Sequence, residues 1–486
     1  MPSGCFEQTS SAAYPNVLAL EYMKRTNKLT PAIHAKAEGY IANGYQRLLT
    51  FEVPGGGFSW FGDAPANKIL TAYGLMEFHD MSKVYDVDPK LLQRTQQWLA
   101  GQQLPDGSWK PDTHNIDDGA TDRYNSDVLR ITACIAWSLQ NTEYKGPAVD
   151  RAIEFVEKRM DGATDAYTLA VIANLAADYG RDREFTQHAV QQLLDARTEK
   201  DEQVWWTTDE TGVYGTGASA AVETTGLAVQ ALLRSGESSG VARKALTYLV
   251  SKKDASGTWG TTQATIMALR ALLTEKGAAD VRGTATVLLN GKPAETLVLS
   301  SENNDLYHQF VFNAVDQGKT NTVGIRFDGK GALTYQVAGS YFLPWDQKPA
   351  VEPLSIDVSY DRTSLFQDDI ATATATVRNN LHKAAKMVIL DLGIPPGFEL
   401  LTEDLQDYRD KSAGLKSGHL SKFSVTATQA ILYFDSFAPG DIVKVKYRLQ
   451  AKYPIRAKTL KSRVYEYYAP EVSSVAPPVQ LEVRGR

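Results

Sequence analysis

The chain has 486 residues, of which 43% are hydrophobic and 22% are charged, and its formal net charge is −6. The length allows two to four domains, and the composition is that of an ordinary globular protein. The negative charge argues against a nucleic-acid partner, which requires clustered lysines and arginines, and no apolar run reaches the roughly 18 residues of a membrane-spanning helix. Two cysteines are too few for a disulfide framework.

The first expected element is a helix in the segment TSSAAYPNVLALEYMKR, which begins at Thr9. The hydroxyl residues at 9–11 are suitable helix caps, and the following stretch supplies an apolar face. Cys5 and Gln8 stand at i and i+3, so on a first helical turn their side chains face the same way. Attack of the Cys5 sulfur on the Gln8 side-chain carbonyl, with loss of ammonia, would close an internal thioester. A thioester is a good acyl donor because thiolate leaves easily. The alternative interpretation is that Cys5 and Gln8 are neighbours by chance and form no bond.

The first part of the chain repeats a two-helix unit. One helix ends in a Leu-containing turn, a Gly loop follows, an aromatic residue closes it, and a helix rich in small residues then opens near a Thr. The repeated positions are Leu48, Gly56 and Phe58; Leu99, Gly107 and Trp109; Leu249, Gly257 and Trp259; and Thr71, Thr132, Thr168, Thr224 and Thr265. Such units bury their faces only by stacking on neighbours. We therefore expect an α/α toroid over residues 1 to about 275, with the small-residue helices as its inner layer.

After residue 275 the pattern changes to short alternating runs rich in Val, Thr, Tyr and Phe. ATATATVRN and DIVKVKYRLQAKY are two examples, and both are typical of β-strands. A Pro-containing stretch from Leu343 to Pro353 is the expected boundary between two β domains.

The repeat also supports a rival class of protein. The segment from Gln103 to Trp109 resembles the Q-x-x-x-G-x-W elements of terpene cyclases, which share a toroid. Those enzymes need a carboxylate cluster, and the nearest candidate is Asp117 with Asp118, which we interpret as a solvated turn. A toroid enzyme acting on isoprenoids or glycans, or a non-reactive scaffold, remains the alternative to acyl transfer.

A resemblance to a known family favours acyl transfer. The hexapeptide Gly4-Cys5-Phe6-Glu7-Gln8-Thr9 resembles the Gly-Cys-x-Glu-Gln thioester motif of the α2-macroglobulin and complement family. Residues 29–62 are similar to a later segment of the same domain, and LKSRVYEYYAPE resembles the end of the family's receptor-binding domain. The chain departs from the usual motif at Phe6, where these proteins often have Gly, and at Thr9, where they often have Asn.

The resemblance implies a multidomain α + β protein. Residues 1–275 would form the thioester-containing toroid, 276–346 the C-terminal part of a CUB-like β domain, and 350–486 a receptor-binding macroglobulin β-sandwich. The family's other macroglobulin domains precede this region, so we expect a C-terminal fragment with Met1 added and a half-CUB sheet with exposed strand edges.

The implied function is that of a protease inhibitor rather than an enzyme. The Cys5–Gln8 thioester would trap an attacking protease, or tag a surface, by acyl transfer to lysine amines or hydroxyls, with no metal and no cofactor beyond this cross-link. The lack of glycosylation sequons, and of cysteines in the expected receptor-binding domain, points to a bacterial protein. It would act outside the cytoplasm, either secreted or, in the full-length bacterial protein, periplasmic or membrane-anchored, in a defence resembling innate immunity.

Further site residues follow only from the resemblance. His114 corresponds to a histidine that attacks the thioester first in complement proteins, although Ile116 replaces the family's acidic residue; without this histidine, amines should be preferred. Tyr465, Tyr467 and Tyr468 would shield the thioester, unless they simply pack between strands. The family's receptor-contact helix corresponds to residues 401–411, where acidic residues dominate, so binding to the animal receptor is not expected.

Overall fold

The computed structural model describes residues 5–25, 29–112, 127–212, 215–253, 258–274, 281–304, 308–339 (without 314, 317, 332, 334, 336 and 338), 352–467 and 469–485. The chain forms two compact units. The first contains helices α1 to α11 and a small sheet, and the second is built mainly from β-strands.

The helices of the first unit follow one another with short connections. They are α1 (Phe6–Arg25), α2 (Pro31–Leu49), α3 (Lys68–Ser82), α4 (Pro89–Gly101), α5 (Val128–Asn141), α6 (Ala148–Glu157), α7 (Ala166–Tyr179), α8 (Arg183–Asp195), α9 (Gly217–Ser235), α10 (Ser239–Ser251) and α11 (Thr262–Thr274). Two short hairpins lie between them, β1 (Glu52–Val53) with β2 (Gly57–Phe58), and β3 (Thr198–Lys200) with β4 (Gln203–Trp205). No helix in the described ranges is long and apolar enough to cross a membrane.

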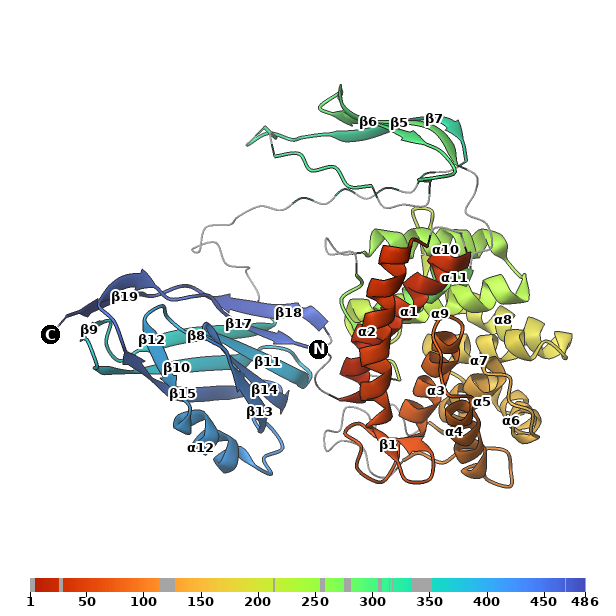
Figure 1. Ribbon diagram of the computed structural model, residues 1–486, viewed down its shortest axis with the longest axis horizontal. Helices are drawn as coiled ribbons and strands as arrows, with labels where there is room; N and C mark the ends of the chain where they lie inside the picture. Colours follow the sequence, from red (N-terminus) through yellow and green to blue (C-terminus); the bar gives the residue numbers. More distant parts are fainter. Residues whose placement is uncertain are drawn as a thin grey trace. The chain divides into compact units, whose positions relative to one another are not determined.

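The odd-numbered helices form a closed inner ring. Helix α1 packs on α3 and on α11, α3 packs on α5, and α5 packs on α7. The ring continues where Nδ2 of Asn174 on α7 donates to the Leu227 carbonyl on α9, at 2.8 Å, and where Gln230 on α9 donates to the Met267 carbonyl on α11, at 3.4 Å. Figure 1 shows the green α11 beside the red α1, although they lie at opposite ends of this part of the sequence.

Burial distinguishes the inner helices from the outer ones. In α3 and α7 nearly every side chain is buried, whereas in α4 only Leu91, Thr95 and Leu99, on one face, are buried. A helix that is apolar all round must lie inside, and an amphipathic one covers it. The expected α/α toroid, with small-residue helices inside, is confirmed.

The aromatic residue of each repeat links an outer helix to the next inner helix. The indole N–H of Trp109 donates to the Leu99 carbonyl in the last turn of α4, at 2.7 Å, and its backbone N–H donates to the Thr132 hydroxyl on α5, at 3.2 Å. The same pair of bonds recurs at Trp206 with Leu193 and Thr225, and at Trp259 with Leu249 and Thr265, and Phe58 keeps the backbone bond to Thr71. The Trp206 repeat was not predicted from the sequence, and the threonine that accepts its backbone bond is Thr225, next to the Thr224 expected near this helix start.

A three-stranded antiparallel sheet follows the toroid, in the order β6-β5-β7. Helix α11 ends at Thr274, and the strands are β5 (Arg282–Leu289), β6 (Lys292–Leu299) and β7 (Val323–Lys330). Its buried core is small, with Val281, Ala285 and Leu299 at its centre, and most of β6 is exposed. The assignment of this sheet to a CUB-like domain, and the expected domain limits, stay predictions.

The second unit is a β-sandwich with one helix. A four-stranded sheet has the order β12-β15-β10-β8, a five-stranded sheet has the order β13-β14-β11-β17-β18, and a three-stranded sheet has the order β16-β19-β9. Alternating small and branched residues of β10 and β15 point into a shared core, which confirms the expected sandwich (Figure 1). The elements are β8 (Leu354–Tyr360), β9 (Ser364–Phe366), β10 (Ile370–Asn379), β11 (Ala385–Gly393), β12 (Phe398–Leu401), α12 (Glu403–Ser412), β13 (Leu420–Val425), β14 (Gln429–Phe437), β15 (Ile442–Ala451), β16 (Ile455–Lys458), β17 (Ser462–Glu466), β18 (Ala469–Ala476) and β19 (Gln480–Arg484).

Candidate functional site

Cys5 occupies the N-cap position of α1. Its carbonyl accepts the first helical hydrogen bond, from the Thr9 N–H at 3.0 Å, and the helix itself begins at Phe6. The Cys5 N–H donates to Oε1 of Gln8 at 3.3 Å, and the backbone amides of Glu7 and Gln8 lower the pKa of the Cys5 thiol. This hydrogen bond is one of the two bonds of a capping box, in which the side chain at the third helical position accepts from the N-cap N–H, here with cysteine where Ser or Thr is usual. The cap therefore brings Cys5 and Gln8 together at one end of the helix.

The hydroxyl residues at 9–11 do not cap the helix, so that expectation was wrong. The Thr9 hydroxyl donates to the Cys5 carbonyl at 3.0 Å, and the Ser11 hydroxyl donates to the Gln8 carbonyl at 2.6 Å. Ser10 lies between them and donates to Glu77 on α3. The helix begins earlier than expected because Cys5 and Gln8 supply the capping groups.

The Cys5 side chain lies in a sheltered place. The residue is 9% exposed, and Gln8 is half-buried. Burial raises the pKa of the Cys5 thiol, although the backbone amides of Glu7 and Gln8 oppose this shift. The thiol is therefore largely protonated and poorly exposed to water.

Phe6 anchors the start of the helix in the toroid core. Its ring is fully buried, and its centroid lies 6.0 Å from that of Phe51 and 5.4 Å from that of Phe58. Its backbone N–H donates to the Trp60 carbonyl at 2.9 Å. The ring fits because Gly74 on α3 lies opposite, where an added Cβ would stand 2.6 Å from the Phe6 Cζ. The departure from the usual motif at Phe6 is thus matched by a glycine on a neighbouring helix.

Two buried carboxyl groups lie near the start of α1, Glu7 on α1 itself and Glu77 on the neighbouring α3. Burial raises the pKa of Glu7 to about 7, against a hydrogen bond from Thr262, and it raises the pKa of Glu77 to about 8, against the bond from Ser10. Both groups hold protons well above the usual range for a carboxyl group. Nowhere in the described part of the chain do three or more His, Cys, Asp or Glu residues gather in a way that could hold a metal ion.

Several residues of the expected site either lie outside the described residues or belong to the second compact unit. Gly4, His114, Tyr468 and the pair at 117–118 lie outside the described residues. Tyr465 lies on β17, half-buried, with the Arg463 guanidinium 4.6 Å from its ring centroid. Tyr467 follows that strand and is 37% exposed. The acyl-transfer role of His114 and the shielding role of the tyrosines stay predictions.

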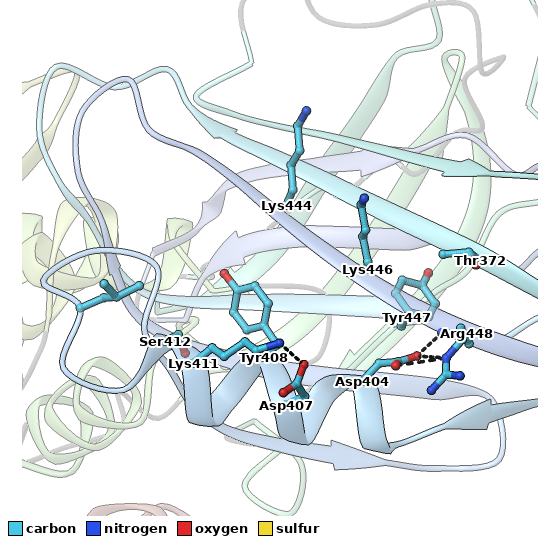
Figure 2. A pocket seen from close by; sticks show the side chains of 11 residues that line it. Thr372, Asp404, Asp407, Tyr408, Lys411, Ser412, Lys444, Lys446, Tyr447 and Arg448 are labelled. Atoms are coloured by element: carbon cyan, nitrogen blue, oxygen red, sulfur yellow. Dashed lines mark hydrogen bonds and ion pairs between the residues drawn. The ribbon is translucent and has the colours of Figure 1, made fainter.

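A separate groove lies on the β-sandwich between α12 and β15, with a volume of about 510 Å³ (Figure 2). Two acids of the helix are paired there, Asp404 with Arg448 at 2.9 Å and Asp407 with Lys411 at 2.5 Å. Lys444 and Lys446 extend from one face of β15, and they make no ion pair with any described residue. The face of α12 is therefore less acidic than its sequence indicates. The groove also contains no buried reactive group like Cys5 among its lining residues.

Comparisons with known proteins agree with both parts of the fold. The A-macroglobulin TED domain family matches residues 1–274, and the A-macroglobulin receptor binding domain family matches residues 383–477.

The relatives add two facts about extent and fold. Ovostatin of Gallus gallus is 24% identical over 98% of this chain, which spans only 33% of that protein. The fold also resembles native alpha-2-macroglobulin from Escherichia coli, solved from domain MG7 to the C-terminus (TM-score 0.65, 17% identity, 100% of this chain and 74% of that chain). Salmonella alpha-2-macroglobulin reacted with methylamine is similar too (TM-score 0.65, 16% identity, 100% of this chain and 30% of that chain). The chain therefore belongs to the alpha-macroglobulin family.

Proposed function

We propose that Cys5 and Gln8 form an internal thioester that acylates an attacking protease. The Cys5 sulfur bonds to the side-chain carbonyl carbon of Gln8, and the amide nitrogen leaves as ammonia. An amine of the target then attacks that carbonyl carbon and loses a proton, while the Cys5 sulfur leaves and is protonated. The products are an amide between Gln8 and the target and a free Cys5 thiol.

The observation that carries this proposal is the capping box. The Cys5 backbone N–H holds the Gln8 side chain beside Cys5 at the start of α1, within a toroid of the alpha-macroglobulin family. The partial positive charge of the helix N-terminus favours negative charge on the departing sulfur. A structurally similar protein, Salmonella alpha-2-macroglobulin, was solved after reaction with methylamine, a small amine of the kind expected to open such a bond.

The resulting activity is inhibition rather than catalysis. Each molecule can acylate one target, because the thioester is consumed, so the protein is a single-turnover trap of proteases and not an enzyme. It needs no metal or cofactor. We place its action outside the cytoplasm, in concert with the macroglobulin domains that precede this region in longer family members. Whether hydroxyls compete with amines depends on His114, for which a transfer role is part of the proposal.

Intact mass spectrometry tests the proposal directly. A formed thioester lowers the mass by one ammonia and blocks one of the two thiols to alkylation. Methylamine should then add at Gln8 and expose the Cys5 thiol. Cys5→Ala should abolish all three effects, whereas Cys134→Ala, the matched control, should leave them intact. Two alkylatable thiols, the full mass and no methylamine uptake in the wild-type protein would refute thioester formation in this chain.

A further inference from the structure

Tyr14, on the inner face of α1, belongs to a buried polar network that joins the first and last inner helices. Its hydroxyl donates to Oδ2 of Asp80 on α3, at 2.6 Å, and accepts from Nη1 of Arg270 on α11, at 2.9 Å. Arg270 also forms an ion pair with Asp80 at 3.5 Å, and their side chains are only 7% and 5% exposed. Because Tyr14 and Arg270 are 256 residues apart, this contact closes the ring of helices.

The network keeps its charges over the whole physiological pH range. Burial by itself would raise the pKa of Asp80, but the charges of Arg270 and Lys83 bring it down to about 2. Burial by itself would lower the pKa of Arg270. Tyr14 and Asp80 have the larger effect, so the pKa of the guanidinium is raised above its ordinary value. A buried charge of this kind is tolerated only while its partner is in place.

The same network extends through the other inner helices. Arg270 contacts Oδ1 of Asn141 on α5, at 3.5 Å, and Asn141 donates to Asp178 on α7, at 3.0 Å. Asp178 forms an ion pair at 3.2 Å with Arg234 of α9, which also contacts Asn174 at 3.4 Å. The contacts of Arg234 are thus with α7, whereas those of Arg270 are with α1, α3 and α5.

A stripe of polar residues on α1 faces these neighbours. Glu7, Ser10 and Tyr14 follow one another at helical spacing, and all three are buried. The Ser10 hydroxyl donates to Glu77 on α3, and Thr262 on α11 lowers the pKa of Glu7. Apolar packing is non-directional and lets a helix slide or rotate, but a buried hydrogen bond is lost when either group moves. These contacts therefore fix the axial position and the rotation of α1.

The reactive end of α1 depends on these contacts more than an ordinary helix end would. Pro15 lies inside the helix and has no N–H, so the carbonyl of Ser11 lacks its normal helical bond. The segment from Phe6 to Tyr14 is therefore less firmly held by the rest of the helix. Tyr14 is the last residue of this segment and lies about 14 Å along the helix axis from Cys5.

We infer that Arg270 is a positioning residue for the Cys5–Gln8 pair. Through Tyr14 and Asp80 it holds the reactive end of α1 between α3 and α11, and so it keeps the thioester sheltered from water. This inference rests on the proposed thioester function. Helix α11, at the far end of the toroid sequence, thus helps to control how long the thioester survives.

The test compares Arg270→Gln with Arg234→Gln. Both variants remove a buried arginine from one network, but only the first loses contacts with α1. In intact protein, Arg270→Gln should shorten the lifetime of the thioester in water at least tenfold, measured by the appearance of the Cys5 thiol, and should speed hydrogen exchange of the α1 amides. Arg234→Gln should leave the lifetime within about twofold. Tyr14→Phe, which keeps the fold's packing, should shift both readouts in the direction of Arg270→Gln.

Two outcomes would overturn the inference. One is an unchanged thioester lifetime and unchanged α1 exchange in Arg270→Gln and Tyr14→Phe. The other is a lifetime that falls equally in Arg234→Gln, in proportion to lost thermal stability, which would indicate a purely structural role. If the wild-type protein forms no thioester, the proposed function fails, and hydrogen exchange of α1 in the same variants still decides whether Arg270 positions the helix.

Discussion

The backbone N–H of Cys5 donates to the side-chain oxygen of Gln8 at 3.3 Å. The hydrogen bond does two things at once. It caps the first turn of α1, and it keeps the Gln8 carbonyl next to the residue whose sulfur is proposed to attack it. The spacing that permits the chemistry is therefore also the spacing that begins the helix.

The capping role of Cys5 can be separated from its chemical role. Cys5→Ser and Cys5→Ala both remove the sulfur, so both should abolish methylamine uptake and thioester formation. Ser is a good N-cap and Ala is not, so the alanine variant should be about 1 kcal/mol less stable toward unfolding than the serine variant. Urea unfolding followed by circular dichroism measures the difference. Equal stability of the two variants would mean that Cys5 does not cap α1.

The tryptophan of the repeat should contribute to toroid stability through its indole N–H. Trp109 is fully buried and donates to the Leu99 carbonyl at 2.7 Å. Trp109→Phe should lower the free energy of unfolding by about 1 to 3 kcal/mol, since it removes a buried hydrogen bond and leaves a void. Trp205→Phe is the control, because Trp205 is half-buried and stacks on Tyr248 at a centroid distance of 5.2 Å. Similar losses in the two variants would argue against the linking role of the repeat.

Local spacing made part of this architecture predictable. The Leu-to-Trp interval is 10 residues at Trp109 and at Trp259, so those repeats stand out in the sequence. At Trp206 the interval is 13 residues, because the β3–β4 hairpin lies between Leu193 and the tryptophan. The repeat there keeps its contacts but loses its spacing, which is why sequence inspection missed it.

The surroundings of the site were harder to predict because they depend on distant residues. The Cys5–Gln8 pair is local, and its motif belongs to a known family. The partner of Tyr14 is Arg270, 256 residues away, and the space for Phe6 is provided by Gly74 on another helix. Even the helix start was misplaced, since cysteine is not a usual cap and the hydroxyls at 9–11 offered a more familiar one.

Glu77 should make the toroid less stable as the pH rises. Its pKa is about 8 in the folded protein, mainly because of burial, against an ordinary value of 4.5. Between these two values the unfolded chain has lost the proton that the folded chain still holds, so stability falls as pH rises through this window. Glu77→Gln cannot ionise. It should match the wild-type stability near pH 5 and exceed it near pH 8, by on the order of 3 kcal/mol.

Unfolding free energies of wild-type and Glu77→Gln protein at several pH values measure this effect. Glu7 has a pKa of about 7, so it also makes the free energy of unfolding fall as pH rises, and this contribution remains in the Glu77→Gln variant. Asp80 has a lowered pKa of about 2, so its contribution is lost only in strong acid, below this window. A wild-type slope that Glu77→Gln leaves unchanged would show that Glu77 does not hold its proton in the folded state.

Gly74 should be required for the shelter around Cys5. A methyl group there would stand 2.6 Å from the Phe6 Cζ, so Gly74→Ala must displace the Phe6 ring, which lies between Phe51 and Phe58 and has little room to move. We expect a loss of about 1 to 3 kcal/mol in stability from overpacking. Because Phe6 is the neighbour of Cys5, we also expect faster hydrolysis of the thioester.

Gly39→Ala is the matched control for this variant. Gly39 also lies inside a helix, α2, but nothing stands within 4 Å of the added carbon, so the variant should gain about 0.5 to 1 kcal/mol from helix propensity. Its thioester lifetime should equal that of the wild-type protein. If Gly74→Ala weakened the fold and still left that lifetime unchanged, the burial of Phe6 would serve the toroid core alone and not the protection of the reactive bond.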